Sequence, residues 1–413
     1  MTAAALLPRY VAGTRALGVW STIALAVSIP VSTALDNILL SVAALAWLAG
    51  VEYKAKIAVL MHNPVFQAAL LLFGVLLIGT LYSKAAPGDT SLFMKKYLDL
   101  ALIPVMAWVF ITARNRTRTL QVFAGALAAI LLISCALKSG LLPMQPWLRA
   151  TPDSALVFKL RITHNILMAF AAFLYAWLAC SASTRAAKLS WGALAALAVV
   201  NVLLMVQGAT GYFVLIGLVF LFGWQRGRLK GIGIAVGAAL AIITVLSLVP
   251  GTTFHKRVQQ ILFEVQHQDP DRPAETSTGF RLEFYRNTLT LIGKNPVFGT
   301  GTGSFPAAYA ELVQDTGKDP ARNPHNQFLL ISVQTGLLGL GALLWLLWQQ
   351  WRLAPRLPTL LERGLAQGLV VMMVIVCMLN SALLDHTEGL LYAWLTALLY
   401  AGLQPAPTAV ASR

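Results

Sequence analysis

Twelve apolar segments recur along this chain of 413 residues, and each is close to the length that an α-helix needs to cross a bilayer. They lie near residues 16–35, 37–51, 65–82, 97–113, 119–143, 165–183, 189–206, 210–224, 231–250, 327–350, 365–384 and 388–403. Helices are expected because a helix satisfies its own backbone hydrogen bonds inside lipid. With 58% hydrophobic and only 11% charged residues, the chain is too apolar for a soluble protein. The sequence therefore predicts an all-α, polytopic transmembrane protein with about twelve transmembrane helices.

One long polar insertion interrupts the apolar segments. We expect three parts: membrane helices in residues 1–250, the insertion in 251–326, and further membrane helices in 327–413. The insertion ends on the polar run Arg322–Gln327, just as the chain becomes apolar again. Ionisable residues are costly at the edge of a hydrophobic span and are usually kept for function. The insertion is therefore predicted to be the working part of the protein.

The charges of the short loops predict an orientation. One set of loops, including 52–64, 114–118 and 225–230, carries sixteen Lys and Arg residues but only two acids, Glu52 and Glu362. By the positive-inside rule this side is cytoplasmic, together with both termini, and the insertion lies outside. The net charge of +15 is then a topology signal, so no nucleic-acid partner is expected. No small-residue cleavage site follows a short apolar core, so no removable signal peptide is expected.

Neither the cysteines nor the acidic residues indicate a metal. Cys135, Cys180 and Cys377 all lie in apolar segments, without metal-ligand spacing and without a disulfide framework. Asp269 and Asp271 form an Asp-x-Asp run, which is a metal and nucleotide-sugar motif in some glycosyltransferases. Here the run lies among prolines, in a segment predicted to be outside, whereas nucleotide sugars are cytoplasmic. We therefore expect neither a metal nor another cofactor.

Several outer residues are candidate substrate contacts. Arg161 carries positive charge against the orientation rule, which favours an anionic ligand there. Lys84 either reaches the membrane interface or helps to bind the same anion. The turn Gln207–Gly211 contributes Gln207 as a polar contact, or serves only as a tight turn. Asp385, in the last outer turn, either takes part in binding, through a partner arginine, or is simply solvated.

An amphipathic helix is predicted for residues 278–289, where apolar residues recur at three and four positions. Arg281 lies in its predicted first turn, where unpaired N–H groups add to the positive charge. Arg286 is about 140° further round the helix. Arg281 is therefore the stronger anion contact and Arg286 a possible helper. The alternative for Arg281 is a salt bridge to Glu283 or contact with a phospholipid head group.

The insertion ends with a glycine-rich run and a histidine. The Gly299–Gly303 run lacks the preceding strand and the final spacing of a dinucleotide fingerprint, so a compact turn is predicted. His325 stands at the entrance to the apolar segment 327–350. Pro324 fixes its approach, and Asn326 is placed to orient the ring. Histidine takes up a proton near neutral pH, so His325 is a candidate general base.

Together these features resemble the O-antigen ligase family, whose core is shared with O-antigen polymerases. The resemblance is carried by the helix number, the large late loop, Gly279-Phe280-Arg281, the Asn295–Gly301 turn and His325-Asn326. It implies a GT-C-like glycosyltransferase of the bacterial inner membrane, with its active site facing the periplasm. Such an enzyme transfers a glycan from undecaprenyl diphosphate to lipid A–core in lipopolysaccharide biosynthesis, without metal or nucleotide sugar.

The resemblance also implies roles for single residues. The family's loop arginine maps to Arg281 and its histidine to His325. The donor diphosphate would rest on Arg161 and Arg281, and His325 would deprotonate the acceptor hydroxyl, which inverts the anomeric centre. Relatives often carry an arginine soon after the turn that ends at Gly211. This chain has Thr210-Gly211-Tyr212 instead, which leaves the role of the turn open.

Three other functions remain open from the sequence. An O-antigen polymerase or a protein oligosaccharyltransferase would use the same lipid-linked donor. A secondary transporter would differ in class, with charged residues near the bilayer midplane and broken helices in an inverted repeat. The charged residues cluster instead at the segment ends, which favours the glycosyltransferase.

Overall fold

The computed structural model describes residues 3–152, 154–206, 208–248, 255, 259, 262–263, 277–316 and 319–403. Within these residues there are fourteen α-helices, and the only strand-like pairing is an isolated bridge between Thr151 and Ser154. The helices are α1 (Ala3–Ser28), α2 (Thr33–Ala49), α3 (Tyr53–Met61), α4 (Pro64–Gly79), α5 (Pro87–Phe110), α6 (Ala113–Lys138), α7 (Arg161–Ser181), α8 (Arg185–Val200), α9 (Ala209–Leu248), α11 (Ser277–Lys294), α12 (Phe305–Val313), α13 (Gln327–Leu353), α14 (Leu360–Leu379) and α15 (His386–Tyr400). The predicted all-α class is confirmed for these residues.

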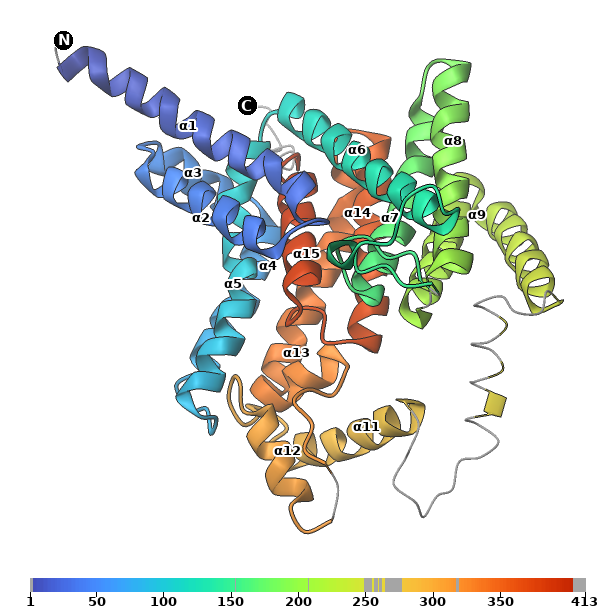
Figure 1. Cartoon of the computed structure of the whole chain (residues 1–413). Helices are drawn as coiled ribbons and strands as arrows, with labels where there is room; N and C mark the ends of the chain where they lie inside the picture. Colours follow the sequence, from blue (N-terminus) through green and yellow to red (C-terminus); the bar gives the residue numbers. More distant parts are fainter. Residues whose placement is uncertain are drawn as a thin grey trace, which may run out of the picture.

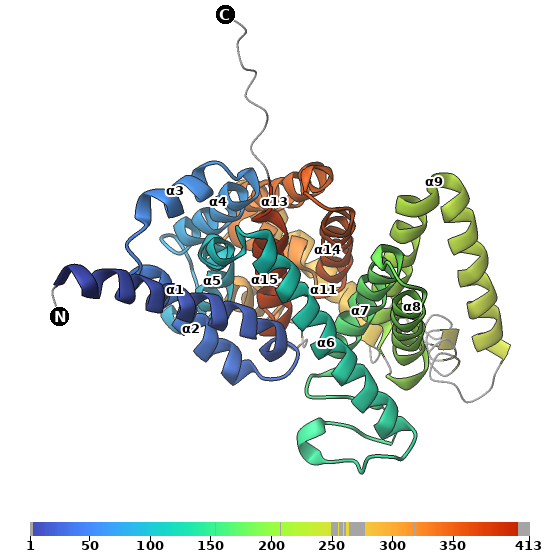
Figure 2. The same cartoon turned by 90° about the horizontal axis from the view of Figure 1, so that it is seen from above.

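Helix α15 lies at the centre of the molecule (Figures 1 and 2). Its residues from Gly389 to Tyr400 are all buried, as expected for a helix that is apolar around its whole circumference. Its indole and phenol groups are paired inside: Trp394 donates to the Thr22 carbonyl at 3.1 Å, and Tyr392 donates to Gln350 at 2.7 Å. Helices α5 and α14 pack against α15. Helices α1–α3 and α8–α9 form opposite flanks (Figure 2).

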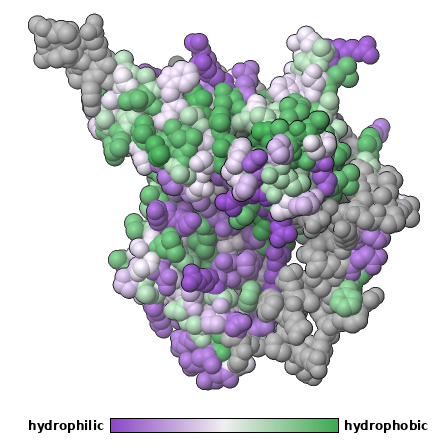
Figure 3. All heavy atoms as spheres, viewed as in Figure 1, coloured by the Kyte–Doolittle hydropathy of each residue, from purple (hydrophilic) through white to green (hydrophobic). Residues whose placement is uncertain are grey.

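The two ends of the molecule differ. Helices α11 and α12 lie together at one end, and the start of α1 lies at the other (Figure 1). Hydrophobic residues form a band toward the α1 end of the face drawn in Figure 3, whereas hydrophilic residues gather toward the end that carries α11 and α12. The part of the polar insertion that carries α11 and α12 therefore caps one end of an apolar helical body.

Fewer membrane spans are found than the sequence predicted. Among the described residues, seven helical segments are long and apolar enough to cross a membrane, or eight if α2 and α3, bent by 114°, form one span. A helix coincides with every one of the twelve predicted segments, but α4 and α15 have only 16 and 15 residues. Helix α5 carries Lys95, Lys96 and Asp99 within its length. The protein is thus a multi-pass helical membrane protein with seven or eight candidate spans among the described residues, and the predicted twelve are not shown.

Helix α9 accounts for two of the predicted segments. It turns back at Arg228, where φ is 48° and ψ is −128°. Its two arms lie side by side in Figure 2. A Cβ atom on Gly231 would lie 1.9 Å from the Gly223 carbonyl oxygen, so the arms touch through bare backbone. The predicted segments 210–224 and 231–250 are the two arms of this helical hairpin.

Local sequence signals explain where several helices begin. Asn63 caps α4 through its side chain, with Pro64 at the first helical position. Thr359 and Glu362 form a capping box at the start of α14. Asn326 accepts a hydrogen bond of 3.0 Å from the Leu329 N–H and so caps α13. The last of these caps stands directly beside His325.

Helix α13 is broken at Gly336, and the glycine-rich turn of the insertion fills the break. At Gly336 φ is 62° and ψ is −154°, so the helical hydrogen-bond pattern is interrupted. The N–H groups of Thr300 and Gly301 donate to the carbonyls of Val333 and Gln334, each at 2.8 Å. Backbone groups freed by the break are thereby satisfied, as burial requires.

The same turn also reaches α4. The Thr302 N–H donates to the Gly79 carbonyl at 3.0 Å, and the Thr302 hydroxyl donates to the Leu76 carbonyl at 2.6 Å. Gly299, Gly301 and Gly303 all have positive φ, as a compact turn requires. The prediction of a compact turn is confirmed, and the turn is wedged between α4 and α13.

Candidate active site

His325 lies in the connection between α12 and α13. Its φ of 51° is left-handed, which is strained for a residue with a side chain. The His325 N–H donates to the side-chain oxygen of Asn323 at 2.9 Å, which holds this conformation. The half-buried ring stacks on Phe284 of α11, with ring centroids 6.1 Å apart and an interplanar angle of 24°. Helix α11 and Asn323 therefore fix the direction of the His325 ring.

Arg281 acts on this histidine from α11. The amphipathic helix predicted for residues 278–289 is confirmed, but it begins at Ser277, so Arg281 lies at the start of its second turn rather than in its first. Burial, and next the positive charge of Arg281, hold the pKa of His325 below its ordinary value of 6.5. The structure thus brings Arg281 close enough to His325 for its charge to act there. Arg286 is exposed, whereas Arg281 is half-buried.

The sequence suggested that Asn326 orients the His325 ring, but in the structure its side chain makes other contacts. Its side chain caps α13, and its Nδ2 donates to the Met378 carbonyl at the end of α14, at 3.2 Å. Tyr285 of α11 donates to the same carbonyl at 2.9 Å and approaches the His325 carbonyl at 3.5 Å. These contacts join α11, the His325 loop and the end of α14 into one unit.

The end of α14 also reaches the start of α9. Asn380 donates to the Thr210 hydroxyl at 3.3 Å. The next residue, Ser381, donates to Asn323 at 3.4 Å, and Asn323 holds the His325 backbone. Thr210 of the Gln207–Gly211 turn is thereby connected to the histidine backbone through three hydrogen bonds, although Gln207 itself lies outside the described residues.

Arg161 is the first residue of α7 and is exposed beside the start of α9. One turn further on, Asn165 is completely buried, and Cβ atoms on Gly208 or Gly211 would lie 2.4 Å and 2.5 Å from its side chain. Both amide atoms of Asn165 lack a hydrogen-bond partner among the described residues. Arg161 therefore stands where α7, α9 and the end of α14 converge. Within the part of the chain that is described, no hydrogen bond or ion pair joins it to Arg281 or His325.

The remaining predicted contacts lie further out. Lys84 follows α4 and is exposed, and its backbone N–H donates to the Thr300 carbonyl at 3.2 Å, beside the glycine-rich turn. Asp385 is the N-terminal cap residue of α15 and is exposed, without a side-chain capping bond. Both belong to the same end of the molecule as His325, through the contacts of their loops.

A second group of charges, largely missed from the sequence, lies buried at the start of α15. Asp36 of α2 is fully buried and accepts a hydrogen bond of 2.5 Å from Ser28. Its other oxygen lies 3.4 Å from His386 Nε2 and 4.0 Å from Lys159 Nζ. Lys159 also donates to Thr387 at 3.1 Å, and burial lowers its pKa in spite of the nearby carboxylates.

Two more acids complete this group. Glu388 is buried and accepts a hydrogen bond of 2.6 Å from Thr163. A Cβ atom on Gly389 would lie 3.5 Å from Asp99 Oδ2. The sequence did contain a signal for this buried group. Asp36 and Asp99 are isolated acids among apolar residues, which usually indicates a specific partner.

Removal of Lys159 should destabilise the fold. Lys159→Met would leave Asp36 buried without its ammonium partner, which typically costs about 3–5 kcal/mol. We expect a clearly lower midpoint of thermal unfolding for the purified protein. The double variant Asp36→Asn/Lys159→Met should recover part of the loss, because neither charge is then left alone. A Lys159→Met protein as stable as the wild type would contradict this role for the pair.

Metal ligands are the other feature that the sequence addressed. Within the described ranges, no three His, Cys, Asp or Glu side chains are arranged to hold a metal ion. Asp269 and Asp271 lie outside those ranges. Cys135, Cys180 and Cys377 are all free thiols.

Fold and site together define a multi-pass membrane enzyme, with a histidine and an arginine at the polar end of its helical body. Residues 192–344 match the family model described as O-Antigen ligase (Wzy_C). This match covers 153 of the 413 residues, so the chain carries an O-antigen ligase (Wzy_C) domain over that range. The matched range includes Arg281, His325 and Asn326 but neither Arg161 nor Asp385. No curated protein matches the chain.

Proposed function

We propose that this enzyme transfers a glycan from undecaprenyl diphosphate to lipid A–core oligosaccharide, as an O-antigen ligase. The observation that carries the proposal is that Arg281 lies near enough to His325 to lower its pKa, with both residues inside the matched range. The match to the O-antigen ligase model supports a lipid-linked O-antigen substrate. A base beside a fixed cation is what glycan transfer from a diphosphate needs when no metal takes part.

In the proposed reaction, His325 takes the proton from a hydroxyl group of the acceptor sugar. That oxygen attacks the anomeric carbon, a new glycosidic bond forms, and the bond from this carbon to the diphosphate oxygen breaks. The electron pair leaves with the diphosphate, and the configuration inverts. The lowered pKa of His325 supports the role of base, because the ring is then neutral at neutral pH and can accept a proton.

The diphosphate would be held by arginines. Guanidinium groups suit phosphate because they present a planar, permanently charged fork of donors. Arg281 is the nearer candidate, since its charge already reaches His325. Arg161 is supported by the polar contacts that connect α9 to the His325 loop. Lys84 and Arg286, both exposed, would act as outer contacts for the glycan or the lipid head.

The transporter alternative has one structural feature in its favour, the break in α13. In transporters, broken helices line a substrate cavity near the bilayer midplane. Here the break at Gly336 is filled by the protein's own glycine-rich turn, through Thr300 and Gly301. The break is thus a packing joint, which supports the glycosyltransferase.

Polymerase and protein oligosaccharyltransferase activities would use the same donor and are separated by the acceptor. We expect the purified enzyme to glycosylate lipid A–core with undecaprenyl-diphosphate-linked glycan, and to do so in excess chelator. Deletion of the gene should remove the polymer ladder from lipopolysaccharide and leave carrier-linked polymer behind. Longer glycans on the carrier alone would assign a polymerase instead, and transfer only to protein would assign an oligosaccharyltransferase.

We also place the His325 end of the molecule in the periplasm and both termini in the cytoplasm. The support is the charge distribution, because the loops at the opposite end carry mostly Lys and Arg. Reporter fusions at residues 62 and 114 should be active as cytoplasmic reporters, and fusions at residue 316 as periplasmic ones. A cytoplasmic residue 316 would overturn both the orientation and the proposed access to lipid-linked glycan.

Arg281 provides a test with two separate readouts. Arg281→Ala should lower the transfer rate by about 10²–10³-fold, as the loss of a single transition-state donor typically does. Arg281→Lys should recover only part of the rate, because the fork geometry is lost. The pKa of His325 should rise without the nearby cation, so the acidic limb of the rate profile should move to higher pH.

The matched control for Arg281 is Arg114, which is exposed in the first turn of α6. Arg116 is unsuitable as a control because it is buried and paired with Glu362 at 2.7 Å. Arg114→Ala should keep the full rate and the same pH profile. Equal losses in Arg114→Ala and Arg281→Ala would mean that Arg281 is a general surface charge and not a substrate contact.

A further inference from the structure

A cavity of about 360 Å³ lies between the bend of α9, the end of α7 and the start of α14. It is far from His325: Arg363 in its wall and Met378 beside the histidine are 15 residues apart on α14, which is about 22 Å of helix. The wall contains Arg228 and Arg363, the indoles of Trp177 and Trp224, and a pair of glutamines. Among the described residues, no Asp or Glu contributes to this wall.

The two arginines are presented by rigid parts of the fold. Arg228 is the residue at which α9 turns back, with a positive φ of 48° and an exposed side chain. The close approach of Gly223 and Gly231 holds the two arms together directly behind it. Arg363 is half-buried, and its Nε donates to the Leu357 carbonyl at 2.7 Å, which fixes the guanidinium beside the start of α14.

Hydrogen bonds connect three side chains along one side of the cavity. Trp177 Nε1 donates to Gln225 at 3.1 Å, and Gln225 donates to Gln367 at 2.9 Å. The guanidinium of Arg226 lies over the Trp177 ring, 5.9 Å from its centroid. The polar groups on this side of the cavity are thus held in fixed positions, and no acid of the described chain lines the wall beside the two arginines.

The surroundings of the cavity are apolar and exposed. Trp224, Leu229 and Leu360 have 46%, 78% and 65% of their surface accessible, as expected for side chains that face lipid. Tryptophan is enriched where membrane and water meet. Basic pockets between transmembrane helices are typical sites for phospholipid head groups. A free phosphate ion would make no favourable contact with this apolar rim.

We propose that this cavity binds the phosphate head group of an anionic phospholipid. The phosphate lies between Arg228 and Arg363, and the acyl chains lie along the apolar rim near Leu360. The site is independent of the glycan chemistry, since none of its residues belongs to the His325 end of the molecule. Lipid bound there connects the bend of α9 to the start of α14.

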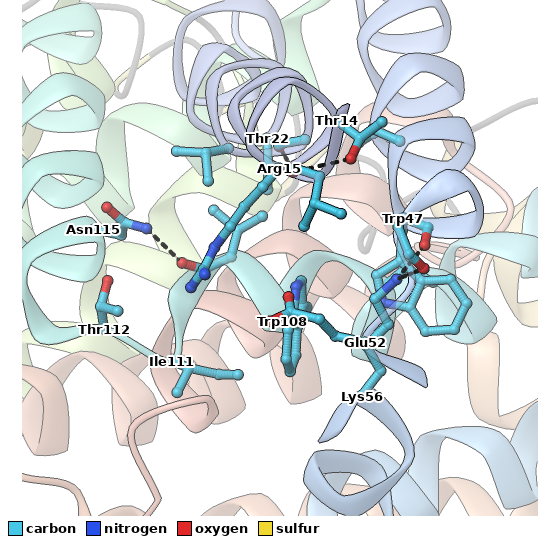
Figure 4. A pocket seen from close by; sticks show the side chains of 18 residues that line it. Thr14, Arg15, Thr22, Trp47, Glu52, Lys56, Trp108, Ile111, Thr112 and Asn115 are labelled. Atoms are coloured by element: carbon cyan, nitrogen blue, oxygen red, sulfur yellow. Dashed lines mark hydrogen bonds between the residues drawn. The ribbon is translucent and has the colours of Figure 1, made fainter. Parts of the chain in front are cut away.

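A second cavity provides the comparison. It lies between α1, α2 and α5, and Arg15, Lys56, Trp47 and Trp108 point into it (Figure 4). Glu52 is part of its wall, and Lys56 is already used, because it donates to the Gly50 carbonyl at 2.7 Å. Unlike the first cavity, this one has an acid beside its two cations, so Arg15 serves as the control.

The test uses the purified full-length protein and native mass spectrometry with phosphatidylglycerol or phosphatidylethanolamine. The wild type should retain phosphatidylglycerol in preference, and Arg228→Gln should reduce this retention at least 5-fold while phosphatidylethanolamine is unaffected. Arg15→Gln should retain phosphatidylglycerol like the wild type. Added phosphatidylglycerol should also raise the thermal midpoint of the wild type, and this rise should be lost in Arg228→Gln.

Two outcomes would overturn the proposal. One is unchanged phosphatidylglycerol retention in both Arg228→Gln and Arg363→Lys. The other is full displacement of the lipid by millimolar inorganic phosphate, which would assign the cavity to a free phosphate. If Arg228→Gln unfolds, Arg363→Lys is measured in its place. This variant keeps the positive charge but loses the planar guanidinium fork, so it should also retain less phosphatidylglycerol.

Discussion

The His325→Ala variant is expected to lose most of its glycan transfer while it still folds. Loss of general-base assistance typically lowers a rate by about 10²–10⁴-fold. The fold should survive because the ring is only half-buried and stacks on Phe284, while the backbone conformation is held through Asn323. The measurement is the single-turnover rate of transfer to lipid A–core, beside the thermal midpoint of the same preparation.

The control for this experiment is His62→Ala. His62 is exposed at the end of α3, and its removal should leave the rate unchanged. His325→Gln separates a base from a binder, because glutamine can hydrogen-bond the substrate but cannot take up its proton. If His325→Gln kept the wild-type rate, His325 would be a binding group and the proposed base would have to be another residue.

The Gly301→Ala variant is expected not to fold. A Cβ atom there would lie 2.1 Å from Ser83 Cα, and the φ of 100° is unfavourable for any residue with a side chain. The neighbour is backbone rather than a mobile side chain, so the turn would have to leave its place between α4 and α13. That movement would expose the unpaired carbonyls of Val333 and Gln334, each at a cost of about 1–3 kcal/mol.

The matched control is Gly341→Ala, in the second half of α13. No atom lies within 4 Å of a Cβ built at Gly341, so this substitution should be neutral or slightly stabilising. Both variants are compared by size-exclusion profile and thermal midpoint in detergent. A stable, monodisperse Gly301→Ala protein would show that the turn is not tightly seated.

Much of the fold was predictable because it depends on local patterns. Apolar segments of helical length located every membrane helix, and the periodicity of residues 278–289 predicted α11. The glycines of the 299–303 run were correctly assigned to a compact turn. The number of spans was not predictable in the same way, because α15 is apolar from complete burial inside the protein and not from contact with lipid.

Other features depend on contacts between distant parts of the chain. The sequence around Gly336 does not by itself indicate a break in α13. The break is filled by a turn that lies more than thirty residues earlier in the chain. The role of Asn326 was misjudged for a similar reason: helix capping and the Met378 carbonyl use its side chain. Arg281, by contrast, lies near enough to His325 to lower the pKa of its ring, while the assignment of both residues to one catalytic site stays a prediction.

The wedged turn has a consequence for the order in which the protein can be completed. Helix α4 is made early, but the carbonyl groups of Leu76 and Gly79 acquire their Thr302 partner only after the insertion has been synthesised. Helix α13 follows later still, and its break closes around the same turn. The end of α4 therefore lacks its Thr302 hydrogen-bond partner until synthesis is nearly finished. Because His325 lies just before the helix that completes this joint, the His325 end of the molecule is assembled only when the two distant halves of the chain have met.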